Sequence, residues 1–179
     1  MLNPDAGPSE LQNKVQWDIR FYFSRRGSEN MYQMMKNTFQ VKIEEDSGIK
    51  YVCRKEDELT KNNRQKQREF ISAAMPQMEN PRYCPVKSYE KYISMLSNEV
   101  PYLWQTARFI TFHPEKGHQY GPGKIGHNKL GEFVKKIREK CEISADYTNH
   151  SLRATGITIL KRELFGQTGH VNQWPSLKE

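Results

Sequence analysis

Helical periodicity is the feature that most constrains how this 179-residue chain can fold. Apolar residues recur at steps of three or four positions in the segments 9–23, 31–39, 86–98, 128–141 and 149–160. This spacing puts apolar side chains on one helix face, which must be buried against other elements. Residues 41–43 and 49–53 instead alternate apolar and polar around Asp46-Ser47-Gly48, which predicts a β-hairpin. We therefore expect a fold that is mainly α with a small antiparallel β-sheet, of the α+β class.

The segments between the predicted helices are polar or rich in Gly and Pro. Residues 54–68 form a charged run that we expect to be a solvated loop. Residues 102–126 are aromatic and rich in Gly and Pro, which predicts an irregular connection with one short strand at 108–112. Residues 1–8 are polar with two prolines and a glycine, and we expect them to be disordered. The length then predicts a single domain over residues 9–179.

Charge and cysteine content limit the class of function. Lys and Arg number 28 against 21 Asp and Glu, and the net charge of +7 favours a polyanionic partner such as nucleic acid or an acidic membrane face. Cys53, Cys84 and Cys141 form no C-x-x-C pair, so the sequence indicates an intracellular protein without a disulfide framework. We find no apolar run long enough to span a membrane and no secretory signal, so we expect no membrane partner.

The histidines in the middle of the chain do not form a recognisable metal-binding motif. His113 and His118 are close in sequence, and His127 follows further on. No Cys or carboxylate completes a familiar ligand spacing around them. We therefore expect neither a metal site nor a cofactor.

The sharpest chemical signal is the run Y-T-N-H-S-L-R-A-T at residues 147–155. His150 and Arg153 stand three positions apart where an apolar helix begins, so their side chains can point at one phosphate. A further basic residue, His170, follows Gly169. Structural roles are the alternative: His150 can pack at the helix start, Arg153 can form a surface ion pair, and His170 can be solvent-exposed without a role.

Several motifs occur in the order seen in the catalytic domain of tyrosine recombinases, the phage integrase family. They are R-G-S-E at 26–29, Lys61 in the charged run after the hairpin, H-S-L-R at 150–153 and G-H at 169–170. Longer stretches narrow this resemblance: S-R-R-G-S-E-N at 24–30, T-K-N-N at 60–63, C-P-V at 84–86 and the run at 147–155. In these the chain resembles the Crypton-transposon-derived domain found at the C-terminus of MYM-type zinc-finger and glutamine-rich proteins. The resemblance covers residues 10–179.

The resemblance implies how the phosphate of the reacting DNA would be held. Arg26 and Arg153 would bind its non-bridging oxygens, because the pentacoordinate transition state carries extra negative charge. His150 and His170 would add hydrogen bonds and proton handling near neutral pH. Glu29 would orient Arg26 or a neighbouring histidine.

The resemblance also implies a general acid in the charged run. Lys61 matches the position of the residue that protonates the leaving 5′ oxygen, a task that suits a flexible lysine stem. Lys55 and Lys66 lie in the same run, and the choice among the three stays open.

The chain also departs from the family pattern. In the family, the nucleophile is a tyrosine a little under three helical turns beyond the Gly-His pair; here Ser176-Leu177-Lys178-Glu179 leads up to that place, and the given sequence ends where the tyrosine would be expected. The interval from Arg153 to His170 is short for the family. We also expect no N-terminal core-binding domain, which completes the clamp around DNA in active recombinases. We therefore expect no nucleophile in the chain as given and a loss of catalytic activity.

The expected function is DNA binding in the nucleus by a domain derived from a transposon tyrosine recombinase. The partner would be the phosphate backbone of double-stranded DNA, bound through Lys and Arg in a salt-dependent way. Two alternatives stay open. The first is a truncated active recombinase or integrase that breaks and rejoins DNA strands, with its tyrosine beyond Glu179; the second is a protein-interaction or chromatin-associated module. The sequence also leaves open a homo-oligomer and the DNA sequence that is recognised.

Overall fold

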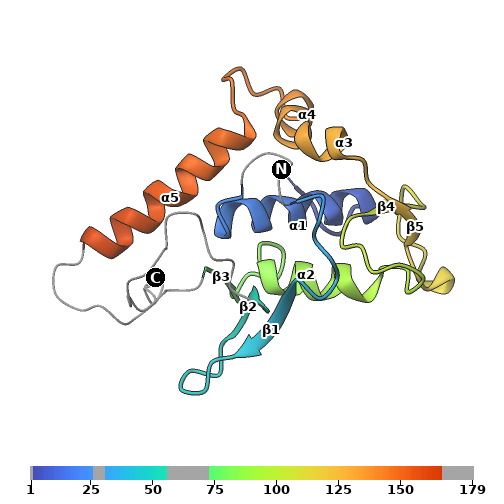
Figure 1. Ribbon diagram of the computed structural model, residues 1–179, viewed down its shortest axis with the longest axis horizontal. Coiled ribbons are helices and arrows are strands. Elements are labelled where there is room, and N and C mark those ends of the chain that lie inside the picture. Colours follow the sequence, from blue (N-terminus) through green and yellow to red (C-terminus); the bar gives the residue numbers. More distant parts are fainter. Residues whose placement is uncertain (1, 26–30, 56–72, 167–179) are drawn as a thin grey trace.

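The computed structural model describes residues 2–25, 31–55 and 73–166 (Figure 1). In these ranges the chain forms α1 (Pro8–Tyr22), β1 (Phe39–Ile43), β2 (Lys50–Arg54), β3 (Ala74–Pro76), α2 (Pro85–Ser94), β4 (Gln105–Ala107), the short 3-10 helix η1 (Pro114–Lys116), β5 (Tyr120–Lys124), α3 (His127–Gly131), α4 (Phe133–Lys140) and α5 (Asn149–Gly166). Helices mixed with two small antiparallel sheets confirm the expected α+β class. None of the described helices is both long and apolar enough to cross a membrane.

Helix α1 is the central element, and α2 and α5 both pack against it (Figure 1). It begins at Pro8, whose fixed φ and missing N–H suit the first helical position. Leu11, Val15 and Ile19 recur at four-residue steps and are at most 1% exposed. The helix predicted from residue 9 is thus confirmed, because its apolar stripe is buried as the spacing requires.

The segment before α1 is held against the body of the domain, whereas the sequence predicts disorder for residues 1–8. Asp5 forms an ion pair with Lys91 of α2 at 2.6 Å. The Tyr120 hydroxyl donates a hydrogen bond to the Pro8 carbonyl at 2.6 Å. A Cβ at Gly7 would lie 2.0 Å from the Ile110 carbonyl oxygen, so only glycine fits this close approach. The residues at 2–8 gain long-range contacts that local composition does not reveal.

The predicted hairpin is confirmed, and a third strand extends it. Strands β1 and β2 pair antiparallel from Phe39 with Arg54 to Ile43 with Lys50. Gly48 turns the chain with φ +68°, which a glycine adopts without strain. Strand β3 then pairs with β2, giving the order β1-β2-β3. The sequence did not indicate β3, because three residues are too short to show an alternating pattern.

The helix predicted at 31–39 is wrong. The segment is made of turns and leads into β1. Its backbone bonds to a distant stretch as well as within its own turns: the Lys36 N–H donates to the Pro101 carbonyl at 2.8 Å, and the Leu103 N–H to the Met34 carbonyl at 3.0 Å. Met31 and Met34 are nevertheless buried. Two methionines three positions apart are thus buried by turns, and their helix-like spacing does not mean that the segment is a helix.

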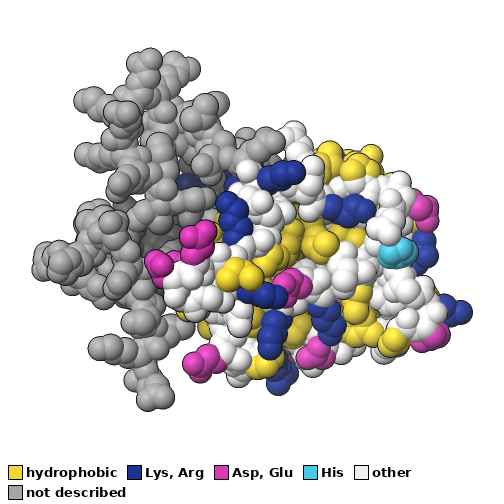
Figure 2. Space-filling view, turned by 90° about the horizontal axis from the view of Figure 1, so that it is seen from below, with side chains coloured by type: hydrophobic (Ala, Val, Ile, Leu, Met, Phe, Trp, Pro, Cys, Tyr) yellow, Lys and Arg dark blue, Asp and Glu magenta, His cyan; other side chains and the backbone are white. Residues whose placement is uncertain are grey.

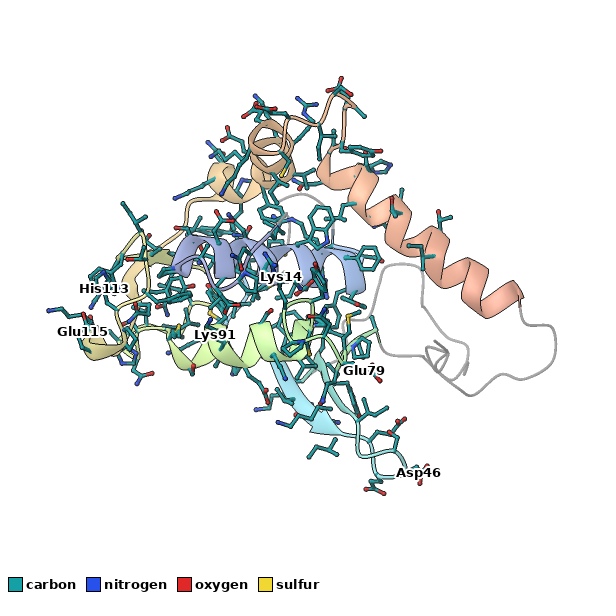
Figure 3. All side chains as sticks on the ribbon, turned by 180° about the vertical axis from the view of Figure 1, so that it is seen from behind. Lys14, Asp46, Glu79, Lys91, His113 and Glu115 are labelled. Atoms are coloured by element: carbon teal, nitrogen blue, oxygen red, sulfur yellow. The ribbon has the colours of Figure 1, made fainter. Side chains whose placement is uncertain are left out.

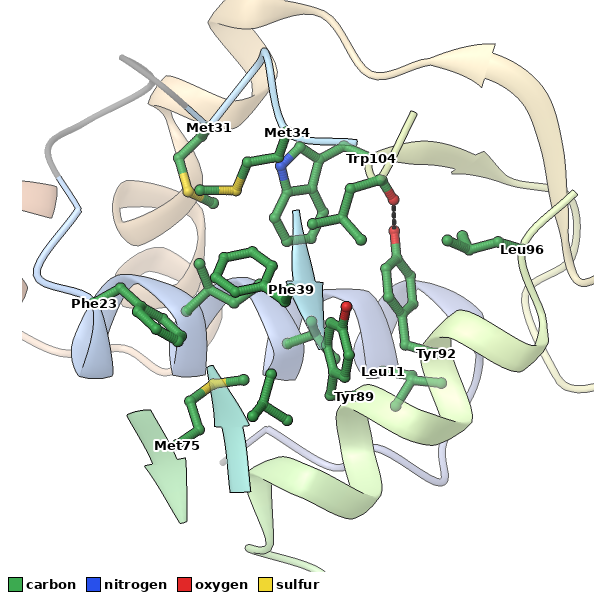
Figure 4. Close-up of a cluster of buried hydrophobic side chains, with 14 of the residues drawn as sticks. Leu11, Phe23, Met31, Met34, Phe39, Met75, Tyr89, Tyr92, Leu96 and Trp104 are labelled. Carbon is green, nitrogen blue, oxygen red and sulfur yellow. Dashed lines mark hydrogen bonds between the residues drawn. The ribbon is translucent and has the colours of Figure 1, made fainter. Parts of the chain in front are cut away.

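The hydrophobic core lies between α1, α2 and the strands (Figure 4). Tyr92 of α2 is its polar anchor, because its hydroxyl donates to the Leu103 carbonyl at 2.6 Å and accepts from the Gln12 side chain at 2.8 Å. Its ring packs edge-on against Tyr120, with centroids 5.0 Å apart. Helix α2 ends at Ser94, a few residues before the predicted end near 98.

The connection at 102–126 contains two strands, and the single strand predicted at 108–112 is wrong. Strands β4 and β5 flank that stretch and pair with each other. Ile110, the centre of the predicted strand, is 92% exposed. The buried Gln105 side chain explains where β4 lies. It donates to the Ser97 and Tyr102 carbonyls and so ties β4 to the segment that follows α2.

The helix predicted at 128–141 is divided in two, and this division shapes the site. Helix α3 stops at Gly131, and α4 starts at Phe133. Helix α5 begins at Asn149, as predicted. A second hydrophobic cluster of Phe133, Val134 and Leu152 seats α4 and α5 on Trp17 and Phe21 of α1.

Candidate nucleic-acid interface

Two of the six predicted site residues belong to the described part of the chain. His150 is exposed and Arg153 half-buried, both in the first turns of α5. Lys55, an alternative general acid, is exposed just after β2. The others lie outside the described residues: Arg26, Glu29, Lys61 with its alternative Lys66, and His170.

A hydrogen bond joins the start of α5 to the end of α1. Arg153 Nε donates to the Ser24 carbonyl at 3.0 Å. Ser24 has φ 49°, and the Arg25 N–H donates to the Arg20 carbonyl at 3.1 Å, so the chain turns sharply as it leaves α1. Ser24 opens the S-R-R-G-S-E-N motif and Arg153 closes the H-S-L-R motif. Two motifs far apart in sequence therefore meet at this bond.

Close packing of helix backbones fixes the approach of α5 to α1. A Cβ at Gly156 would lie 2.7 Å from the Phe21 carbonyl oxygen, so a larger residue would push the helices apart. Gly156 follows Arg153 by three positions, so both lie on the face of α5 toward α1. This contact brings α5 near enough for the Arg153 side chain to reach Ser24.

The first turn of α5 is capped and anchored. Thr148 and Ser151 form a reciprocal cap, in which the Thr148 N–H donates to Ser151 Oγ at 3.2 Å and the Ser151 N–H to Thr148 Oγ1 at 3.3 Å. Asn149 Nδ2 donates to the Gly131 carbonyl at 2.6 Å and so ties the turn to the break between α3 and α4. His150 points to solvent from this fixed turn.

A cavity of about 470 Å³ lies between α4 and the first turn of α5. Basic and aromatic side chains share its lining with the α5 turn: Gly131, Glu132, Lys135, Arg138, Tyr147, Thr148, Asn149 and His150. The N-terminus of the 18-residue α5 adds the positive end of its dipole. The cavity thus joins His150 to two cations of α4.

The cations of α4 are partly neutralised by neighbouring carboxylates. Arg138 pairs with Asp146, and Lys135 lies 4.0 Å from Glu139. Glu132 pairs with Lys136 at 2.9 Å, and this hydrogen bond and charge lower the pKa of the Glu132 carboxyl. The two lysine pairs are exposed, and Asp146 is exposed although Arg138 is half-buried, so these pairs are weak enough for a phosphate to compete for the same cations. Among the described residues, no group of His, Cys, Asp and Glu is arranged to hold a metal ion.

Arg20 holds α3 and α4 in register with α1. It is completely buried, donates to the Leu130 carbonyl at 2.7 Å and lies 4.6 Å from the centre of the Phe133 ring. It also donates to Gln16 Oε1 at 3.1 Å. Burial lowers the pKa of the guanidinium to about 9, so Arg20 remains charged at neutral pH. Because Arg20 is buried, it holds the helices of the site in place but cannot itself contact a ligand.

Sequence reasoning missed Lys135 and Arg138 as members of the site. They are three positions apart on α4, opposite Phe133 and Ile137, which face the core or its edge. The helical spacing of these cations is visible in the sequence. The sequence pattern does not predict the break at Gly131. This break sets the direction of α4 and so turns both cations toward α5.

Similarity to known proteins gives no further assignment of the site, because no family model, no curated protein and no solved structure matches this chain. The interpretation depends on the geometry and on the motifs at 24–30 and 150–153. Of the first motif the structure describes only Ser24 and Arg25, and the contact with the second motif is made by Ser24.

Proposed function

We propose that this domain binds the phosphate backbone of double-stranded DNA in the nucleus, and that it derives from a transposon-encoded tyrosine recombinase. The binding surface would be the α1–α5 junction, defined here as Ser24, His150 and Arg153 together with Lys135 and Arg138 of α4. The observation that carries the proposal is the hydrogen bond from Arg153 to Ser24. It supports a common origin for the two motifs, because it joins the segments in which they lie.

The orientation of Arg153 suits a phosphate ligand. Its Nε is used by the Ser24 carbonyl, which holds the guanidinium plane in one orientation. No acceptor among the described residues is recorded for its two terminal amino groups, and these are the donors that bind phosphate in a paired manner. The capped first turn of α5 and the neighbouring His150 add donors and the helix dipole.

Basic side chains gather at the junction on two adjacent helices, although exposed carboxylates pair with the cations of α4. The face with α2 and the β1–β2 hairpin mixes Lys and Arg with Asp and Glu around hydrophobic side chains (Figure 2). At the junction, His150, Arg153, Lys135 and Arg138 lie on consecutive turns of two adjacent helices. Several cations on one surface can contact several phosphates, which gives salt-dependent binding without a base-specific contact.

Binding is proposed in preference to strand cleavage. As the resemblance implies, cleavage would need Arg26, Lys61 and His170 to act together with a nucleophilic tyrosine. Holding a phosphate needs only cationic donors, which α4 and α5 supply.

The affinity for a short duplex, measured by fluorescence anisotropy, tests the proposal. We expect binding at about 50 mM salt that weakens steeply toward about 200 mM. The double variant Lys135→Ala/Arg138→Ala should bind about tenfold more weakly and reduce the salt slope by about 1 to 2. Lys87→Ala is the matched control, because Lys87 is an exposed cation on α2, across α1 from the junction. No binding at low salt, or equal losses in both variants, would contradict the proposal.

A further inference from the structure

The β1–β2 hairpin projects beyond the body of the domain (Figure 1). Val41 and Ile43 alternate with Lys42 and so share a face with the buried Phe39. Exposure rises along this face, from 4% at Phe39 through 37% at Val41 to 60% at Ile43. Ile49, which follows the turn and lies opposite Glu44, is 48% exposed on the other face of the hairpin. The hairpin therefore presents an aliphatic surface that its own domain leaves uncovered.

Three consecutive carboxylates lie at the tip of the hairpin. Glu44, Glu45 and Asp46 are all exposed, and Asp46 marks the far end of the hairpin in Figure 3. The turn is ordered by the Glu44 N–H, which donates to the Ile49 carbonyl at 2.9 Å, and by a hydrogen bond from Ser47 Oγ to the Glu44 carboxylate. The tip thus combines aliphatic sides with an acidic end in a fixed shape.

A groove of opposite character lies on the other side of the domain. It has a volume of about 400 Å³ between α1 and the pair α3–α4, and we call it the α1–α4 groove. Buried or half-buried Ile125, Phe133 and Ile137 contribute its hydrophobic lining. Exposed lysines also line it: Lys129, Lys136 and Lys140. The groove therefore joins hydrophobic surface to positive charge, as the hairpin joins hydrophobic surface to negative charge.

The three lysines are not equally available to a carboxylate. Lys136 pairs with Glu132 at 2.9 Å, and Lys140 pairs with Glu10. Lys129 makes no ion pair with any described residue. The Lys136–Glu132 pair is exposed and exchanges readily, whereas Glu10, the partner of Lys140, is half-buried and lines the groove as well. Lys129 and Lys136 are therefore the lysines best able to meet an incoming acidic tip.

We propose that the hairpin of one copy docks in the α1–α4 groove of a second copy of this chain. Both parts of each surface match: the carboxylates of the tip meet the lysines, and Ile43 meets the hydrophobic lining. The hairpin cannot reach the groove of its own chain, because the two lie on opposite sides of α1 (Figures 1 and 3). The contact is therefore intermolecular.

The two surfaces differ, so the assembly is head-to-tail. Each copy offers one hairpin and one groove, and such contacts give a ring when the rotation closes and an open chain when it does not. A hairpin tip buries less area than the roughly 1,600 Å² of a standard interface. The association is therefore weak, depends on protein concentration and decreases at high salt.

Sedimentation velocity without DNA tests this proposal separately from DNA binding. We expect the average mass of the wild-type chain to rise above that of the monomer between about 5 and 500 μM. Ile43→Ser should weaken association about tenfold without a change of charge. A wild-type chain that stays monomeric over this range overturns the proposal.

Charge reversal identifies the two partners. Glu45→Lys/Asp46→Lys makes the tip positive, and Lys129→Glu/Lys136→Glu makes the groove negative; each variant alone should associate about tenfold more weakly. An equimolar mixture should recover association, because each variant then meets a groove or tip of opposite sign. Recovery excludes misfolding as the cause of the single losses. If the tip variant weakens association, but the groove variant does not, the hairpin binds elsewhere and the proposal is wrong.

Discussion

The carbonyl oxygen of Phe21 lies 2.7 Å from the position that a Cβ at Gly156 would take. This is closer than real side-chain contacts allow, so the end of α1 and the second turn of α5 touch backbone to backbone. The cluster of Phe133, Val134 and Leu152 seats the neighbouring turn of α5 on the same end of α1. Together these contacts determine where Arg153 lies.

Gly156→Ala should therefore destabilise the domain, although alanine is the better helix former. Helix propensity favours alanine by about 1 kcal/mol, whereas forcing extra atoms into a packed contact costs about 1 to 3 kcal/mol. We expect the net free energy of unfolding to fall, as measured by urea denaturation. Thr155→Ala, at an exposed position on the same helix, is the control and should change stability by less than about 0.5 kcal/mol. A stabilised Gly156→Ala variant would show that the helices do not touch here.

Arg20→Leu should also destabilise the domain. The substitution removes the charged donor of the Leu130 carbonyl at 2.7 Å and the contact with the Phe133 ring. A buried acceptor left without its partner costs about 1 to 3 kcal/mol. Thermal or urea unfolding measures the loss, and Arg82→Leu, at an exposed site, is the matched control. If the two variants had equal stability, Arg20 would not be what holds α3 and α4 to α1.

Asp18 should make stability depend on pH. It pairs with Lys14 inside the domain, and burial raises the pKa of its carboxyl from the usual 3.8 to about 6, against the opposing effect of Lys14. The folded state therefore binds the proton more tightly than the unfolded state does. The contribution of Asp18 to the free energy of unfolding decreases as pH rises from about 4 to about 6, by at most about 3 kcal/mol.

Asp18→Asn removes this titration while it keeps an acceptor for Lys14. Urea unfolding at several pH values should give a flatter profile between about pH 4 and 6 in the variant than in the wild type. Parallel profiles in the two proteins would mean that the Asp18 carboxyl titrates alike in the folded and unfolded chains.

The elements that sequence predicted well are those whose side-chain pattern and burial agree. Leu11, Val15 and Ile19 are spaced as a helix requires and are buried as a helix face. The hairpin follows from alternation around a Gly turn. The helix prediction for 31–39 was wrong because Met31 and Met34 are buried by turns that bond to residues 101–103. Such long-range pairing leaves no pattern in the local sequence.

The site was predictable only in part, for a related reason. His150 and Arg153 stand out because their spacing on a helix carries chemistry. The partner of Arg153 is a backbone carbonyl at Ser24, and any residue type supplies one. Lys135 and Arg138 look like ordinary surface cations until the break at Gly131 turns α4 toward α5. Backbone partners and helix directions come from tertiary packing, which sequence patterns do not encode.

The most direct test of the central claim maps the DNA contact on the folded domain. Backbone amide chemical shifts, followed by NMR as a short duplex is added at low salt, report which residues meet the phosphates. We predict that the largest shifts cluster at residues 21–25, 135–138 and 148–153, with little change in the hairpin at 41–49. Shifts that centre on α2 or the hairpin, or no shifts at all, would contradict DNA binding at the α1–α5 junction.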